Sequence, residues 1–124
     1  VLVRLLTRDY PRQAAIAAEE MRAGPIYLSS TVLMETEWVL RFAYKIDRTQ
    51  VGAALSGVVN LSGAMVDDEA AVRTALGWHA EGMDFADAMH VARLEQADEF
   101  ITFDKAFAHK AGQLSVEPPV RLLK

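Results

Sequence analysis

Residues 82–107 read GMDFADAMHVARLEQADEFITFDKAF, and this stretch decides the fold. Phe100 to Phe103 is an apolar, strand-like run, and Asp104 follows it directly. Before the strand, a helix is predicted from Phe85 to about Gln96, and Lys105 to Ala111 is predicted to form another after it. A short apolar strand between two helices is typical of a parallel sheet, so the stretch indicates an α/β fold.

The rest of the chain repeats this alternation of helix and strand. Further helices are predicted at about 2–7, 12–22, 32–44, 49–58 and 68–79, further strands at 26–28 and 64–66, and edge strands at Val116 and 120–123. This pattern predicts an α/β sandwich with a mostly parallel sheet. Sites in such sheets form at the carboxyl ends of strands, and Asp104 occupies a position of that kind.

Size and composition narrow the possible classes. With 124 residues, 52% of them apolar, the chain is predicted to be a single globular domain spanning 1–124. It has no cysteine, which excludes disulfides, thiolate zinc and a cysteine nucleophile and fits a cytoplasmic protein. No uncharged stretch is long and apolar enough for a membrane span. The net charge of −4 argues against a protein that coats duplex nucleic acid, but not against a local, metal-based nucleic-acid enzyme.

Three carboxylates occupy positions that are unusual for charged groups. On a helical wheel, Glu35 falls between Phe42 and Val39, whereas Glu37 falls opposite, near Arg41, as a surface ion pair. We therefore expect Glu35 to face inward. The alternative is a residue at the rim of the core whose carboxylate reaches water.

Asp87 and Asp104 each have a structural explanation as well. Asp84 and Asp87 resemble a capping box at the start of one helix, and Asp104 can cap the helix that begins at Lys105. A buried carboxylate is costly unless it is paired or binds a metal. If Glu35, Asp87 and Asp104 converge, the expected result is an acidic metal site with raised pKa values in its empty form.

The remaining candidates are weaker. The three histidines share no metal-ligand spacing, and the chain has neither a nucleophile elbow nor a glycine-rich phosphate loop. Trp38 and Trp78 are expected in the core or an interface. Small residues between Gly52 and Gly57 permit close helix packing, within the domain or in a homodimer. Surface cations that could steer a nucleic-acid backbone are Arg4, Arg8 and Lys105.

These motifs resemble the PIN domain of the VapC toxin type. The similarity rests on residues 82–90 together with 100–107, on the glutamate helix at 32–40, and on the opening run at 1–9, so it spans essentially the whole chain. It implies an α/β/α sandwich with a mostly parallel sheet. It also implies a magnesium- or manganese-dependent endoribonuclease, held in check by a cognate antitoxin.

The resemblance assigns roles to particular residues. Glu35, Asp87 and Asp104 are implied to be the catalytic and metal-binding carboxylates. Asp84 is implied to be their neighbour, and Thr102 to support the site through its hydroxyl. Members of the family begin with a strand that carries a first catalytic aspartate, and this chain is expected to lack both, since its match starts at Val1.

Two further classes compete with the metal-dependent nuclease that cleaves RNA. One is a catalytically inactive PIN-like module that binds an antitoxin or associates with itself. The other is a phospho-acceptor receiver domain, which needs an acidic pair after its first strand and a phosphorylated aspartate after its third, an arrangement that this sequence does not offer.

Overall fold

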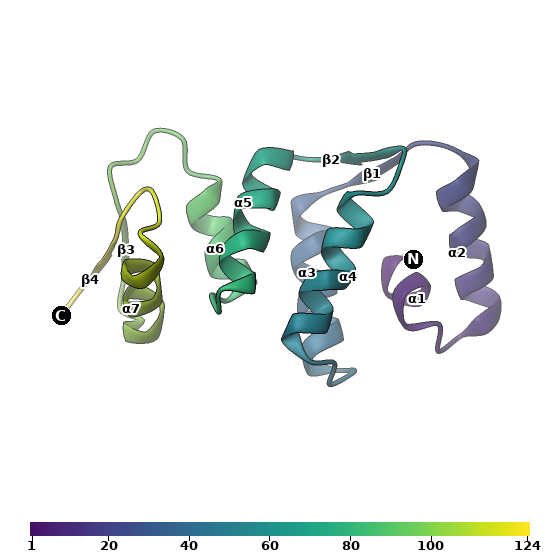
Figure 1. The fold of residues 1–124 in the computed structure, drawn as a ribbon, viewed down its shortest axis with the longest axis horizontal. Helices are drawn as coiled ribbons and strands as arrows, with labels where there is room; N and C mark the ends of the chain where they lie inside the picture. Colours follow the sequence, from purple (N-terminus) through teal and green to yellow (C-terminus); the bar gives the residue numbers. More distant parts are fainter. The chain divides into compact units, whose positions relative to one another are not determined.

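The computed structural model describes all residues from Val1 to Lys124, and they divide into two compact units, Val1–Asp67 and Asp68–Lys124. Figure 1 labels their helices and strands. The first unit contains α1 (Leu2–Thr7), α2 (Pro11–Ala23), β1 (Ile26–Leu28), α3 (Ser30–Phe42), α4 (Arg48–Val59) and β2 (Ala64–Val66). The second contains α5 (Glu69–Ala80), α6 (Phe85–Ala92), β3 (Phe100–Thr102), α7 (Lys105–Leu114) and β4 (Val120–Leu122).

All strand pairing is parallel. In the first unit β1 pairs with β2, with Tyr27 opposite Met65, and in the second β3 pairs with β4, with Ile101 opposite Arg121. The pairs form two separate two-stranded sheets. The α/β class with parallel strands is therefore confirmed.

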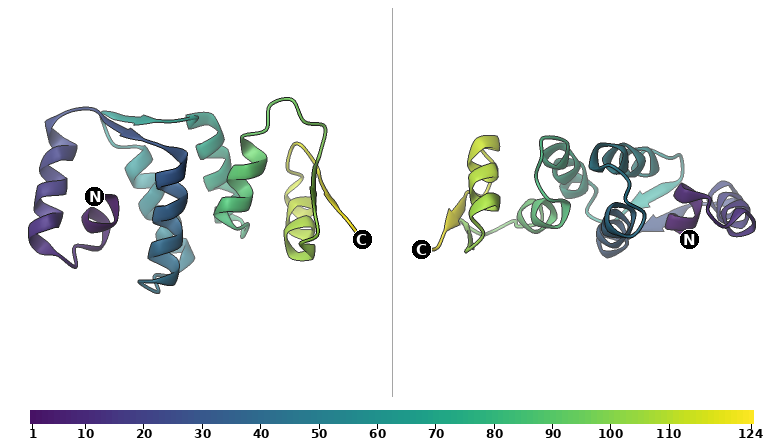
Figure 2. Two further views of the ribbon diagram at one scale, coloured as in Figure 1. Left: turned by 180° about the vertical axis from the view of Figure 1, so that it is seen from behind. Right: turned by 90° about the horizontal axis from the view of Figure 1, so that it is seen from below.

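The core of the first unit lies between α3, α4 and the strand pair. Figures 1 and 2 both show α3 and α4 side by side, and Leu33, Leu40, Val51 and Leu55 are buried. Side-chain caps fix where both helices begin: the Ser29 hydroxyl accepts from the Val32 N–H at 3.1 Å, and the Asp47 carboxylate accepts from the Thr49 N–H at 3.1 Å. These caps satisfy N–H groups that a helix start leaves without partners.

In the second unit, α5 packs against α6, and α7 lies beside the β3–β4 pair. Phe85 and Met89 of α6 and Val72 of α5 are fully buried. Two predicted boundaries were wrong. Helix α6 ends at Ala92 rather than Gln96, because the exposed residues that follow have no apolar face to bury. Val116 is buried but forms no strand.

Candidate acidic site

Asp84 and Asp87 lie at the N-terminus of α6. Asp84 is the N-cap, and its carboxylate accepts a hydrogen bond from the Asp87 N–H at 3.2 Å. The capping role predicted from the sequence is confirmed. Because Phe85, Ala88 and Met89 are drawn into the core, Asp87 is left half-buried rather than free in solvent.

Asp104 directly follows β3 and is the N-cap of α7. Its Oδ1 accepts from the Phe107 N–H at 3.0 Å, while its own N–H donates to the Thr102 hydroxyl, also at 3.0 Å. The Thr102 hydroxyl therefore stabilises the turn between β3 and Asp104. Both oxygens of Asp104 are acceptors and one bonds to the Phe107 N–H, so Oδ2 is available for a ligand.

The carboxyl of Asp87 has a strongly shifted pKa. Burial raises it most, the charges of Asp84 and Asp104 raise it further, and His90 lowers it, which leaves a pKa of about 6 against an ordinary value of 3.8. The negative charges of Asp84 and Asp104 thus both act on Asp87 within the second unit. A carboxyl that is half-buried beside like charges is expected to have a raised pKa.

Glu35 does not face inward. It is exposed, and the carboxylate that α3 buries is that of Glu37, only 2% exposed. Arg41 donates to Glu37 through Nε at 2.8 Å and Nη2 at 3.1 Å, so the ion pair expected at the surface is buried at its acidic end. The prediction that Glu35 faces inward was wrong because it assumed that the helix face with Val32 and Phe42 is buried. These two side chains are 44% and 49% exposed.

The predicted site residues offer carboxylate oxygens as ligands for a divalent cation. Carboxylate oxygens are the ligands that Mg²⁺ and Mn²⁺ prefer, and the negative charges of Asp84 and Asp104 that act on Asp87 favour a cation there. However, no three Asp, Glu or His side chains lie close enough to one another to hold a single ion. Glu35 belongs to the first unit, whereas Asp84, Asp87 and Asp104 belong to the second. The donor chemistry therefore fits, whereas the three aspartates of the second unit do not by themselves form a closed site.

The other predicted residues are placed as follows. His90 is exposed near the end of α6. Trp38 is 57% exposed, which excludes the core and leaves the other predicted place, an interface. Arg4 donates to the Asp9 carboxylate and to the Tyr44 hydroxyl. These hydrogen bonds connect α1 to the segment that follows α3, so Arg4 is not a free surface cation.

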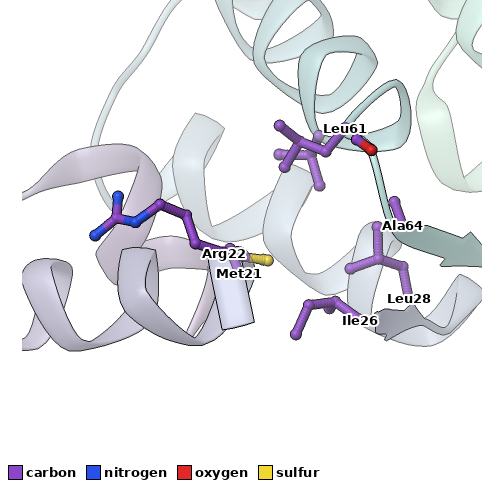
Figure 3. A pocket seen from close by; sticks show the side chains of 9 residues that line it. Met21, Arg22, Ile26, Leu28, Leu61 and Ala64 are labelled. Atoms are coloured by element: carbon purple, nitrogen blue, oxygen red, sulfur yellow. The ribbon is translucent and has the colours of Figure 1, made fainter. Parts of the chain in front are cut away.

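A cavity of about 500 Å³ lies in the first unit and contains none of the predicted site residues. Figure 3 shows Ile26 and Leu28 of β1 on one side of it and Leu61 on the other, with the Arg22 guanidinium turned away. Its lining is predominantly apolar and lacks any cluster of carboxylates. We therefore assign the candidate chemistry to the aspartates of the second unit.

The fold and its carboxylates define an α/β protein with an acidic site. The sequence model of the PIN domain family matches residues 1–113, and the chain belongs to this family. No curated protein and no solved structure matches it. PIN domains are typically nucleases that use divalent metals, so membership indicates nuclease activity. None of the helices has the length and apolar character needed to cross a membrane.

Proposed function

We propose that the protein is a metal-dependent endoribonuclease of the VapC toxin type, which hydrolyses RNA phosphodiester bonds in the cytoplasm. The observation that carries this proposal is the position of Asp87, half-buried at the start of α6 with the charges of Asp84 and Asp104 acting on it. Its carboxyl is held at a helix start beside two further aspartates, at the cost of a raised pKa, in a chain of the PIN family. A carboxyl whose pKa is strongly raised by burial and by neighbouring charges is typical of a functional site.

The residue roles follow from position. Asp87 and Asp104 are proposed to hold Mg²⁺ or Mn²⁺, with Asp84 and Thr102 keeping them in place through the contacts described above. Glu35 is proposed as a further ligand on the strength of its motif. A bound divalent cation supplies positive charge for the phosphodiester and lowers the pKa of water.

Binding of a cognate antitoxin and assembly as a homodimer belong to the same proposal.

One observation favours a different function, that of an inactive PIN-like module that binds an antitoxin or a second copy. It is the lack of any three metal-binding side chains at a common point. Titration of Mn²⁺ into the protein made from its complete reading frame separates the two: heat of binding that is lost in Asp87→Asn supports the nuclease, and no binding supports the module.

The experiment that tests the proposed function is cleavage of circular and linear single-stranded RNA in Mg²⁺, with EDTA as the control. Cutting of the circular RNA identifies an endonuclease, because an exonuclease needs an end. Matching DNA strands test the preference for RNA. The proposed function predicts cutting of both RNA forms with Mg²⁺ and none with EDTA, and cutting that persists in EDTA would overturn it.

A further inference from the structure

An aromatic pair lies on the solvent side of α3. Trp38 and Phe42 are 57% and 49% exposed, their ring centroids are 5.2 Å apart, and their planes are inclined by 39°. Single exposed apolar side chains are common, but two adjacent large rings in water are unfavourable, and a ligand that covers both rings removes that cost. A ligand that binds here is therefore expected to have flat surfaces that pack against the two rings.

A buried ion pair holds these rings in position. Glu37, almost fully buried, fixes the guanidinium of Arg41 with two hydrogen bonds at 2.8 and 3.1 Å. The Cζ of Arg41 then lies 4.4 Å from the centroid of the Phe42 ring. Phe42 is held between this cation and Trp38, so the surface is ordered before any ligand arrives, which reduces the entropy lost on binding.

The surroundings of the pair suit a nucleic acid. Glu35, Trp38 and Phe42 are spaced three and four residues apart, which places them on one face of α3. Arg41 lies over the Phe42 ring, and Lys45 and Arg48 follow it in the sequence, with Asp47 as the one acidic residue from 41 to 48. Stacking rings next to cations are the features that bind single strands without reading their sequence.

We propose that Trp38 and Phe42 form a stacking platform for the bases of single-stranded RNA, beside Glu35, with Arg41 ordering the Phe42 ring and Lys45 and Arg48 contacting the phosphates. The choice of RNA rests on the proposed function. The size of the surface also favours stacking. Half of two aromatic side chains amounts to something on the order of 200 Å², far below the ~800 Å² per partner that a specific protein interface buries.

Binding of a fluorescently labelled single-stranded RNA oligonucleotide, measured by anisotropy in EDTA, tests the platform without cleavage. Trp38→Ala and Phe42→Ala are expected to raise Kd at least tenfold, whereas Trp38→Phe, which keeps a ring, should raise it less than threefold. Val32→Ala changes an exposed residue of the same helix that carries no ring, and it should bind as tightly as wild type. Equal affinity in all four variants would overturn the proposal.

A second readout does not depend on variant stability. Unlabelled RNA should quench the tryptophan fluorescence of the wild-type protein, and Trp38→Phe, which retains only the half-buried Trp78, should lose most of that quenching. Quenching that is unchanged in Trp38→Phe would contradict stacking on Trp38. Sedimentation velocity gives the remaining outcome: if Trp38→Ala converts a dimer to a monomer and leaves RNA affinity intact, the surface is a protein interface.

These outcomes are distinguishable from failure of the proposed function. Ring-dependent RNA binding without metal-dependent cleavage would leave the platform standing and refute the nuclease. Metal-dependent cleavage with ring-independent binding would refute only the platform.

Discussion

Asp84 caps the helix in which Asp87 lies, and the same carboxylate that accepts the Asp87 N–H at 3.2 Å raises the pKa of the Asp87 side chain. The first effect stabilises α6, and the second makes the ionised form of Asp87 less favourable. The N-terminus of α6 is thus well capped, yet ionisation of Asp87 in the folded state is unfavourable. Under the proposed function, a bound cation would remove this unfavourable free energy.

Replacing Asp87 with Asn should stabilise the metal-free fold at neutral pH. Burial and the charges of Asp84 and Asp104 raise the Asp87 pKa to about 6, above the 3.8 of an ordinary aspartate. The folded state therefore binds the proton more tightly, and stability falls as pH rises from about 4 to about 6. After allowance for solvent screening and for a lost helix-dipole contact, Asp87→Asn should gain about 1 kcal/mol at pH 7.5.

Urea denaturation in EDTA measures this effect. The gain should vanish near pH 4, where the Asp87 carboxyl is already protonated in the folded state. Asp98→Asn, in the exposed segment before β3, removes the same charge from the sequence and should change stability little at either pH. An Asp87→Asn variant that is less stable than wild type at pH 7.5 would contradict the account.

Two substitutions at Asp104 should separate its cap from its charge. Asn caps a helix as well as Asp does, so Asp104→Asn should leave stability nearly unchanged, whereas Asp104→Ala loses the bond to the Phe107 N–H and should cost about 1 kcal/mol. Both should lower the pKa of the Asp87 carboxyl, because each removes one of the charges that raise it. Thermal denaturation and NMR titration of Asp87 give the two quantities, and equal destabilisation by Asn and Ala would refute the capping role.

Glu35 and Glu37 should differ sharply when truncated. Glu37→Ala leaves Arg41 without its bidentate acceptor and should cost about 2 kcal/mol, less than a fully buried pair because Arg41 is partly exposed. Glu35→Ala, on the solvent side, should stay within about 0.5 kcal/mol of wild type. Chemical denaturation of both variants tests which glutamate faces the core, and the reverse order of stability would restore the inward Glu35.

The starts of several helices could be predicted from the sequence, because capping hydrogen bonds between residues close in the chain define them. Ser29, Asp47, Asp84 and Asp104 each cap the helix that follows, and these caps were predictable because the side chain bonds to N–H groups two or three residues away. The parallel strands were predictable from short apolar runs between helices.

The orientation of α3 was not predictable, because it depends on packing far along the chain. The helix has apolar residues on both faces, and the wheel favoured the face with Phe42 and Val39. In the structure Leu33, Leu40 and Glu37 pack inward instead. A signal was present in the spacing of Glu37 and Arg41, which suited an ion pair, but spacing alone cannot tell a buried pair from an exposed one.

The central claim is that Asp87 and Asp104 carry a metal-dependent nuclease activity, and the most direct measurement is the rate of RNA cleavage in Mg²⁺ or Mn²⁺ by wild type, Asp87→Asn and Asp104→Asn. The protein should be made from its complete reading frame, and circular dichroism should confirm that each variant folds. We predict that wild type cleaves RNA, that EDTA stops the reaction, and that both variants lose at least 100-fold in rate. Unchanged metal-dependent cleavage in the two folded variants would contradict the assignment of the site.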